Sequence, residues 1–311
     1  MRTRRHRTAL PATEGIHPDS VNLDLWSTGE LVRRLHREDR RALRAVGRIL
    51  PAITQASQAA ARALKAGGRL VYVGAGSSGR LGVLDAAECA PTFGASEREV
   101  RALLAGGARA MAHPREGAED GAAAGRKAVA DLRVGARDFV CGISASSKTR
   151  YVLAALLEAR RRGAFTALVC CSLSRDARRT ADLIVLAKTG PELIAGSTRL
   201  KAGTATRLIL NAVSTAAFTS LGRVYRGRMV ALKPASVKLR ARAQRSLAEL
   251  AGISAVRAQG LLDRAGGRVG LALAMHFTGL PPRAARRALR LHGLRRLEML
   301  ARRRGQSTLR A

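Results

Sequence analysis

The segment VYVGAGSSGRLG, at residues 71–82, constrains the fold more than any other part of the chain. Its apolar start is typical of a buried strand. The glycines Gly74, Gly76 and Gly79 then match G-x-G-x-x-G, the pattern of a strand-to-helix turn around a phosphate. Such a strand–turn–helix unit belongs to a parallel sheet, because only a helical crossover returns the chain for the next parallel strand.

The unit is repeated along the chain. Four further apolar segments follow, bounded by turn residues: VRALLAGG, DFVCGISAS, FTALVCCSL and ADLIVLA. Helical patterns alternate with them, so we predict a three-layer α/β fold, a parallel sheet with right-handed crossovers and helices on both faces. We expect an extended segment and helices over 1–59, with a helix start at the capping-box sequence STGE, residues 27–30. The phosphate-binding domain is predicted over 60–245 and a small helical unit over 246–311.

Composition limits the environment and the core. Aromatic residues make up only 3% of the chain against 47% hydrophobic residues, so small aliphatic side chains must fill the interior. No apolar run reaches the roughly 18–20 residues of a membrane span, and the basic start lacks the apolar stretch of a secretory signal. We therefore expect a soluble cytoplasmic protein without a membrane partner. The four cysteines show no metal-type spacing and are expected to be buried, reduced thiols.

The net charge of +34, from 56 Lys and Arg against 22 Asp and Glu, raises the question of a polyanionic partner. The arginines are scattered among alanines, and the interleaved aromatics that stack on bases are missing. We expect solvated arginine faces and consider nucleic acid an improbable partner. A basic accessory protein that binds polyanions stays open as an alternative.

The glycine turn alone does not identify its phosphate. A dinucleotide needs an acid at the end of the second strand to hold the ribose. That strand ends in glycines, and Glu97 and Glu99 precede it, at its wrong end. The dinucleotide interpretation therefore lacks its second requirement.

Two hydroxyl-rich loops favour a phosphate monoester instead. Ser77 and Ser78 follow the first strand, and SASSKT, residues 144–149, follows the third. Both loops come after parallel strands, so both lie at the carboxyl edge of the sheet, where ligands bind. Hydroxyls, backbone N–H groups and helix dipoles at that edge suit one phosphate group.

These loops resemble the sugar isomerase (SIS) domain. The longer stretches TEG (13–15), GAGSSGRLGVLDAAECAPTFG (74–94), EGAED (116–120) and GSTRLKAGTATRLILN (196–211) resemble the N-acetylmuramic acid 6-phosphate etherases. The resemblance implies an SIS fold, a homodimer and a phosphosugar substrate. It also implies a lyase without metal or cofactor that releases D-lactate by elimination and then adds water, in cell-wall amino-sugar recycling.

Such chemistry needs a base at the carbon next to the open-chain aldehyde and an acid at the departing lactate oxygen. The resemblance implies that Glu88, in DAAEC, serves the lactate oxygen and that Glu119, in EGAED, is the base. It also implies a substrate-binding set, in which the hydroxyl loops hold the phosphate and a basic pair faces the acidic substrate: Ser77, Ser78, Gly79, Ser146, Thr149, Arg199 and Lys201.

The chain departs from the family pattern at three places, one of which is Ala90, where the family has a proline after DAAEC. In the second loop the family's glycine is Ser147 and its proline is Arg150, which matters if the glycine has a positive φ. At 225–239 an Asp position is Ala231 and an Asn position is Ser236. A non-catalytic phosphosugar-binding regulator on the same fold therefore stays open as a second alternative.

Overall fold

The computed structural model describes residues 11–232 and 237–308. Its centre is a five-stranded parallel sheet in the order β2-β1-β3-β4-β5. The strands are β1 (Leu70–Gly74), β2 (Val100–Leu104), β3 (Phe139–Ile143), β4 (Phe165–Cys170) and β5 (Leu183–Leu186). All five strands fall within the predicted apolar segments, which confirms the predicted α/β fold class.

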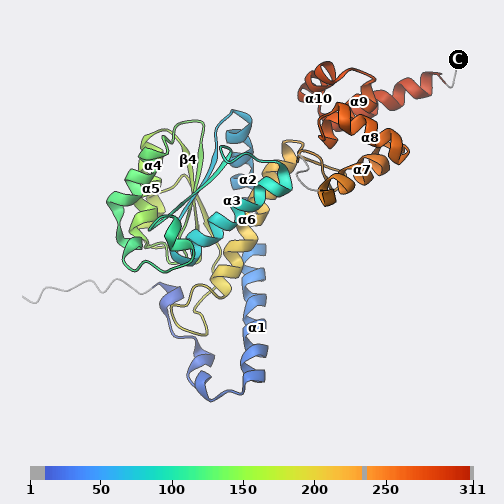
Figure 1. Ribbon diagram of the computed structural model, residues 1–311. Helices are drawn as coiled ribbons and strands as arrows, with labels where there is room; N and C mark the ends of the chain where they lie inside the picture. Colours follow the sequence, from blue (N-terminus) through green and yellow to red (C-terminus); the bar gives the residue numbers. More distant parts are fainter. Residues whose placement is uncertain (1–10, 233–236, 309–311) are drawn as a thin grey trace, which may run out of the picture. The chain divides into compact units, whose positions relative to one another are not determined.

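Helices cover both faces of the sheet (Figure 1). On one face lie α4 (Ala122–Asp131) and α5 (Arg150–Arg161), packed on a core that includes Val73, Val140 and Leu168. The other face carries α2 (Leu50–Lys65), α3 (Gly76–Phe93) and α6 (Lys201–Ser220). Because both faces are covered, β1 and β3 are buried at every residue, which explains their unbroken apolar sequences.

Short 3-10 helices and the long helix α1 precede α2 and the sheet. The 3-10 helices are η1 (Ala12–Glu14), η2 (Pro18–Ser20) and η3 (Leu23–Leu25), and α1 (Thr28–Gly47) follows them. The predicted helix start is confirmed, since the Ser27 hydroxyl accepts a hydrogen bond from the Glu30 amide. The Glu30 carboxylate pairs with Arg34 instead of completing a capping box.

The described chain forms two compact units. The first runs to Ala87 and from Glu97 to Ala217, and the second comprises Glu88–Ser96 and the described residues from Phe218 on. The second unit contains helices that pack around a common apolar core: α7 (Val237–Ala251), α8 (Ala255–Arg264), α9 (Val269–Thr278) and α10 (Pro282–Thr308). The two segments of α10 meet at Gly293, whose φ of +68° is non-helical. The predicted boundary at 245/246 falls inside α7.

A two-stranded hairpin in the second unit was not predicted from the sequence. Strands β6 (Val224–Tyr225) and β7 (Arg228–Met229) pair antiparallel across a two-residue turn. Both turn residues, Arg226 and Gly227, have positive φ, as tight hairpins require. The departure at Ala231 follows this hairpin, whereas Ser236 lies outside the described residues.

The four cysteines are buried, as predicted, and none is in a disulfide bond. Burial raises the pKa of the Cys141, Cys170 and Cys171 thiols to about 12, so these thiols stay protonated at neutral pH. Within the described ranges, none of the helices combines the length and the apolar character needed to cross a bilayer.

The packing of α4 on α5 depends on the missing side chain of Gly125. A Cβ there would lie 2.1 Å from the Tyr151 carbonyl oxygen, a backbone atom that cannot turn aside. We predict that Gly125→Ala lowers the free energy of unfolding in urea by about 1–3 kcal/mol. Gly47→Ala is the control, because a Cβ at that helix end meets nothing within 4 Å. An unchanged urea midpoint in Gly125→Ala would contradict the close contact.

Candidate functional site

A cavity of about 330 Å³ lies at the carboxyl edge of the sheet. The strand order explains its position. β1 lies between β2 and β3. The connection from β1 therefore runs to β2 on one side of it, and the connection from β2 crosses back to β3 on the other side. Loops that diverge at such a switch point leave a crevice above the strand ends. The cavity is lined by Glu14, Ala75, Gly76, Ser77, Ser78, Arg80, Ala105, Ala110, Pro114, Arg115, Glu116, Ala118, Glu119, Ala145, Ser146, Thr149 and Thr198.

The glycine turn brings β1 and α3 into backbone contact. A Cβ on Gly74 would lie 2.5 Å from the Gly79 Cα, and Gly76 has a φ of +51°. Only glycine satisfies both the contact and the backbone conformation without strain. The turn places the predicted binding residues Ser77 and Ser78 in the first helical turn at the cavity. Gly79 does not line the cavity, and its amide donates to the Ala75 carbonyl, so a direct substrate contact by Gly79 remains a prediction.

The second predicted loop meets the first at this cavity. Ser146 and Thr149 both line it, beside Ser77 and Ser78. The Thr149 and Ser144 hydroxyls are 2.8 Å apart, and the Ser146 hydroxyl accepts a 3.3 Å hydrogen bond from the Lys148 amide. The four predicted hydroxyl side chains are therefore gathered at one cavity, although they come from segments about 70 residues apart in the sequence.

Ser147 stands at the position of the family's glycine, and its backbone does have a positive φ. Its φ is +55°, so a residue with a Cβ has the left-handed conformation that glycine adopts most easily. The buried Ser147 hydroxyl accepts a 2.7 Å hydrogen bond from the Ser174 amide, and its carbonyl accepts one from the Ser174 hydroxyl. These bonds to the loop after β4 hold the strained residue in place.

Three carboxylates line the cavity. Glu119 lies in the 3-10 helix η5 (Ala118–Asp120), and Glu116 lies just before it. Glu14, from η1, is the third. It lies in the TEG stretch, but no role was predicted for it from the sequence. No group of three or more His, Cys, Asp or Glu in the described part of the chain is arranged to hold a metal ion.

Cationic and hydroxyl groups missed from the sequence also line the cavity. The Arg80 Nε donates to the carbonyls of Ala110 and Met111, each at 3.0 Å, which fixes the guanidinium at the cavity wall. Thr198 adds a hydroxyl from the segment before α6. Arg80 is the residue directly after Gly79 of the glycine turn. Its place beside a predicted phosphate-binding loop could have identified it from the sequence.

Glu88 has a different position from Glu119. It is exposed on α3 and is not among the residues that line the cavity. It follows Ser77 by eleven residues on the same helix, a rise of about 16 Å along the axis. A direct contact of Glu88 with the substrate therefore remains a prediction.

Arg199 and Lys201 line a separate cavity of about 270 Å³. Lys201 is buried and forms an ion pair with Glu38 of α1, which is also 3.2 Å from the His17 Nε2. The amides of Lys201 and Ala202 donate to the Glu192 carboxylate, which caps α6. Arg199 is exposed. The predicted contact of both basic residues with substrate therefore remains a prediction.

Asp85, in the DAAEC segment, joins three elements of the first unit. The Tyr72 hydroxyl of β1 donates to it at 2.8 Å and the Ser214 hydroxyl of α6 at 3.3 Å, while the Arg207 guanidinium lies at 3.8 Å. Burial raises the pKa of the Asp85 carboxyl, although these donors and the cation oppose the effect. Asp85 thus orients α3 and has no part in the cavity lining.

The chain is similar to several known proteins. A model of the glucokinase regulatory protein N-terminal SIS domain matches residues 52–160. The chain is 46% identical to N-acetylmuramic acid 6-phosphate etherase of Trichormus variabilis over 90% of this chain and 91% of that protein. It is 45% identical to the protein of the same name from Rubrobacter xylanophilus, over 89% and 92% of the two chains. Among solved structures, a phosphosugar isomerase from Bacteroides fragilis, itself described as putative, aligns with a TM-score of 0.49, 17% identity and coverage of 65% and 95%.

The buried position of Lys201 generates a prediction. Lys201→Met leaves the Glu38 carboxylate buried without its ammonium partner, so we expect the free energy of unfolding to fall by about 3–5 kcal/mol. Lys188→Met, at an exposed lysine, should change it by less than about 0.5 kcal/mol. Urea denaturation of both variants measures the difference. Equal stability of the two, with a raised KM only in Lys201→Met, would instead assign Lys201 to the substrate.

Proposed function

Because this chain belongs to the N-acetylmuramic acid 6-phosphate etherase family, we propose that it cleaves the lactyl ether of N-acetylmuramic acid 6-phosphate, a step in cell-wall amino-sugar recycling in the cytoplasm. The observation that carries this proposal is the meeting of Ser77, Ser78, Ser146 and Thr149 at one cavity that also contains Glu119. Hydroxyl donors suit the phosphate, and a carboxylate beside them suits the proton transfer.

The phosphate group is assigned to the hydroxyl end of the cavity. The amides of the first turn of α3 add N–H donors and the positive end of the helix dipole there. Arg80, held by two carbonyls, supplies a fixed positive charge at the same wall. Hydroxyls with two arginines, Arg80 and Arg115, favour a monoester, which needs fewer charges than a diphosphate.

The reaction divides into an elimination and an addition. In the open-chain sugar, a base takes the proton from the carbon next to the aldehyde, and the bond between the neighbouring carbon and the lactyl oxygen breaks. An acid protonates the departing oxygen, which yields D-lactate and an unsaturated aldehyde. Water then adds to the double bond, its oxygen at the carbon that lost lactate, and gives N-acetylglucosamine 6-phosphate.

Glu119 is assigned as the base at the sugar carbon, because its carboxylate lines the cavity that contains the four hydroxyls. Glu88 is assigned as the acid that protonates the lactate oxygen. Two carboxylates divide such work when one accepts a proton and the other donates one. Neither assignment requires a metal or a nucleotide, since both steps are proton transfers.

The position of Glu88 favours a homodimer with shared sites. Glu88 is exposed and lies about 16 Å along α3 from Ser77, a span longer than one sugar ring. We therefore propose that Glu88 serves the cavity of a second copy of the chain, while Glu119 serves its own. The regulator alternative has no need of either carboxylate and is not favoured by relatives named as etherases.

The first test measures D-lactate released from N-acetylmuramic acid 6-phosphate. Glu119→Gln should lower kcat by about 10²–10⁴-fold, because the base is replaced by an isosteric amide. Glu97→Gln, at an exposed position before β2, is the matched control and should keep the wild-type rate. Wild-type protein that binds the substrate without releasing lactate would support the regulator.

A second test addresses the sharing of sites. Glu88→Ala and Glu119→Ala should each be inactive alone, whereas their co-expression should recover about a quarter of wild-type activity. That fraction follows because about half of randomly assembled dimers are mixed, and each has one intact site of two. If the co-expressed variants stay inactive although mixed dimers form, Glu88 does not act across the dimer.

A further inference from the structure

A second cavity, of about 610 Å³, lies at the amino edge of the sheet. Arg69 precedes β1, Arg98 and Arg101 flank the start of β2, and Asp138 precedes β3. Because the strands are parallel, this edge is opposite the serine loops, separated from them by about 13 Å of strand. The cavity is lined by Gly67, Gly68, Arg69, Arg98, Arg101, Leu132, Arg133, Gly135, Ala136, Arg137 and Asp138.

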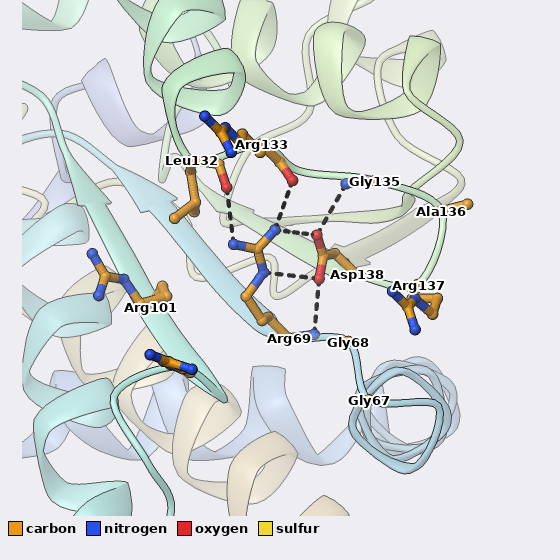
Figure 2. A pocket seen from close by; sticks show the side chains of 11 residues that line it. Gly67, Gly68, Arg69, Arg101, Leu132, Arg133, Gly135, Ala136, Arg137 and Asp138 are labelled. Carbon is orange, nitrogen blue, oxygen red and sulfur yellow. Dashed lines mark hydrogen bonds and ion pairs between the residues drawn. The ribbon is translucent and has the colours of Figure 1, made fainter.

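Arg69 and Asp138 form the framework of the cavity wall (Figure 2). The Arg69 side chain donates to both carboxylate oxygens of Asp138 and to the carbonyls of Leu132 and Arg133, all at 2.6–3.0 Å. Asp138 also accepts from the backbone amides of Arg69 and Gly135. This pair ties the loop before β3 to the start of β1.

Asp138 is the only acid among the lining residues, and the hydrogen-bond acceptor positions of its carboxylate are all occupied. Burial alone would raise the pKa of the Asp138 carboxyl, but its hydrogen bonds to Arg69 and to the Gly135 amide lower it overall, so it stays ionised. Each of its oxygens already accepts two hydrogen bonds. Asp138 offsets the charge of Arg69 and has no acceptor position left for another arginine.

Four arginines of the cavity remain without an acidic partner. Arg98, Arg101, Arg133 and Arg137 are exposed, and none forms an ion pair with an acid of the described residues. Glu97 and Glu99 flank Arg98 in the sequence but do not line the cavity. Figure 2 shows Arg101, Arg133 and Arg137 on different sides of the central Arg69–Asp138 pair. The lining residues therefore carry an excess of four positive charges.

The backbone of the cavity is organised before any ligand binds. Arg133 has a φ of +52°, an uncommon conformation for a residue with a side chain. Its carbonyl accepts a 2.9 Å hydrogen bond from the Arg69 guanidinium, which holds this conformation. The loop that carries Arg133 and Arg137 is thus fixed, so anion binding costs little ordering of the backbone.

The lining decides the chemistry of the ligand. Guanidinium groups bind phosphate oxygens in a bidentate manner, and four of them exceed what one monoester needs. The cavity has no aromatic ring for a base to stack on, and its apolar lining consists of Leu132 and Ala136. A compact ligand recognised through its charge alone fits this composition.

We propose that the cavity at the amino edge of the sheet binds a diphosphate group, at a site separate from the sugar-phosphate cavity. The diphosphate can belong to free pyrophosphate or to a nucleoside diphosphate. Because the lining offers nothing that recognises a base, both sources bind through the same contacts, and adenosine alone does not bind.

Calorimetric titration of the full-length chain with inorganic pyrophosphate tests the proposal. Arg101→Gln/Arg133→Asn removes two cavity charges, and asparagine tolerates the left-handed backbone at 133. This variant should weaken pyrophosphate binding at least about tenfold, since it loses charge-assisted hydrogen bonds. Arg178→Ala is the matched control, at an exposed arginine in η6 (Asp176–Arg179) that is not among the residues lining the cavity. It should bind within about twofold of wild type.

Further arms test the need for two linked phosphates and separate the two cavities. ADP should bind about as tightly as pyrophosphate, and orthophosphate at least about tenfold more weakly because it presents a single phosphate. The double variant Ser77→Ala/Ser78→Ala should leave pyrophosphate binding unchanged, whereas it should weaken binding of the sugar phosphate. The proposal is overturned if pyrophosphate does not bind wild-type protein, if Arg178→Ala weakens binding as much as the cavity variant, or if the serine variant abolishes it. Tight, salt-sensitive DNA binding lost with the same two arginines would assign the cavity to nucleic acid instead.

Discussion

The contact between Gly74 and Gly79 is the constraint on which the rest of the first unit depends. A Cβ at either residue would lie within 2.7 Å of the other's backbone, so strand β1 and helix α3 meet without side chains between them. This contact directs the first turn of α3 toward the strand end and brings Ser77 and Ser78 to the cavity. The same helix then extends to Asp85, whose bonds to Tyr72 and Ser214 hold it against β1 and α6.

The two edges of one parallel sheet serve different electrostatic purposes. At the carboxyl edge, hydroxyls and helix amides surround a cavity whose lining includes two arginines and three glutamates. At the amino edge, a single acid is bound within the wall and four arginines remain. The first arrangement suits proton transfer beside a monoester, because carboxylates and phosphate-binding hydroxyls line the same cavity. The second suits only the binding of a strong anion.

Ser147, which replaces the family's glycine in the second loop, shows how this fold accommodates a substitution at a position with positive φ. Ser147 keeps the left-handed φ that a glycine would adopt, at a cost of order 1 kcal/mol. Its hydroxyl and carbonyl bond to Ser174, so the residue that strains the loop also attaches it to the loop after β4. The cavity hydroxyls of Ser146 and Thr149 are thereby kept beside Ser77.

The amino-acid sequence by itself determined the order of strands and helices around the parallel sheet, because burial on both faces of a sheet demands apolar runs and tight turns demand glycine. It also located the serine loops, since loops after parallel strands share an edge, whereas Glu119 was named from the family resemblance. Only the tertiary structure decided the pairing of Lys201 with Glu38, the exposed position of Glu88 and the arginine cavity. Each of these depends on which distant segments pack together, and no local pattern encodes the partner of a charge.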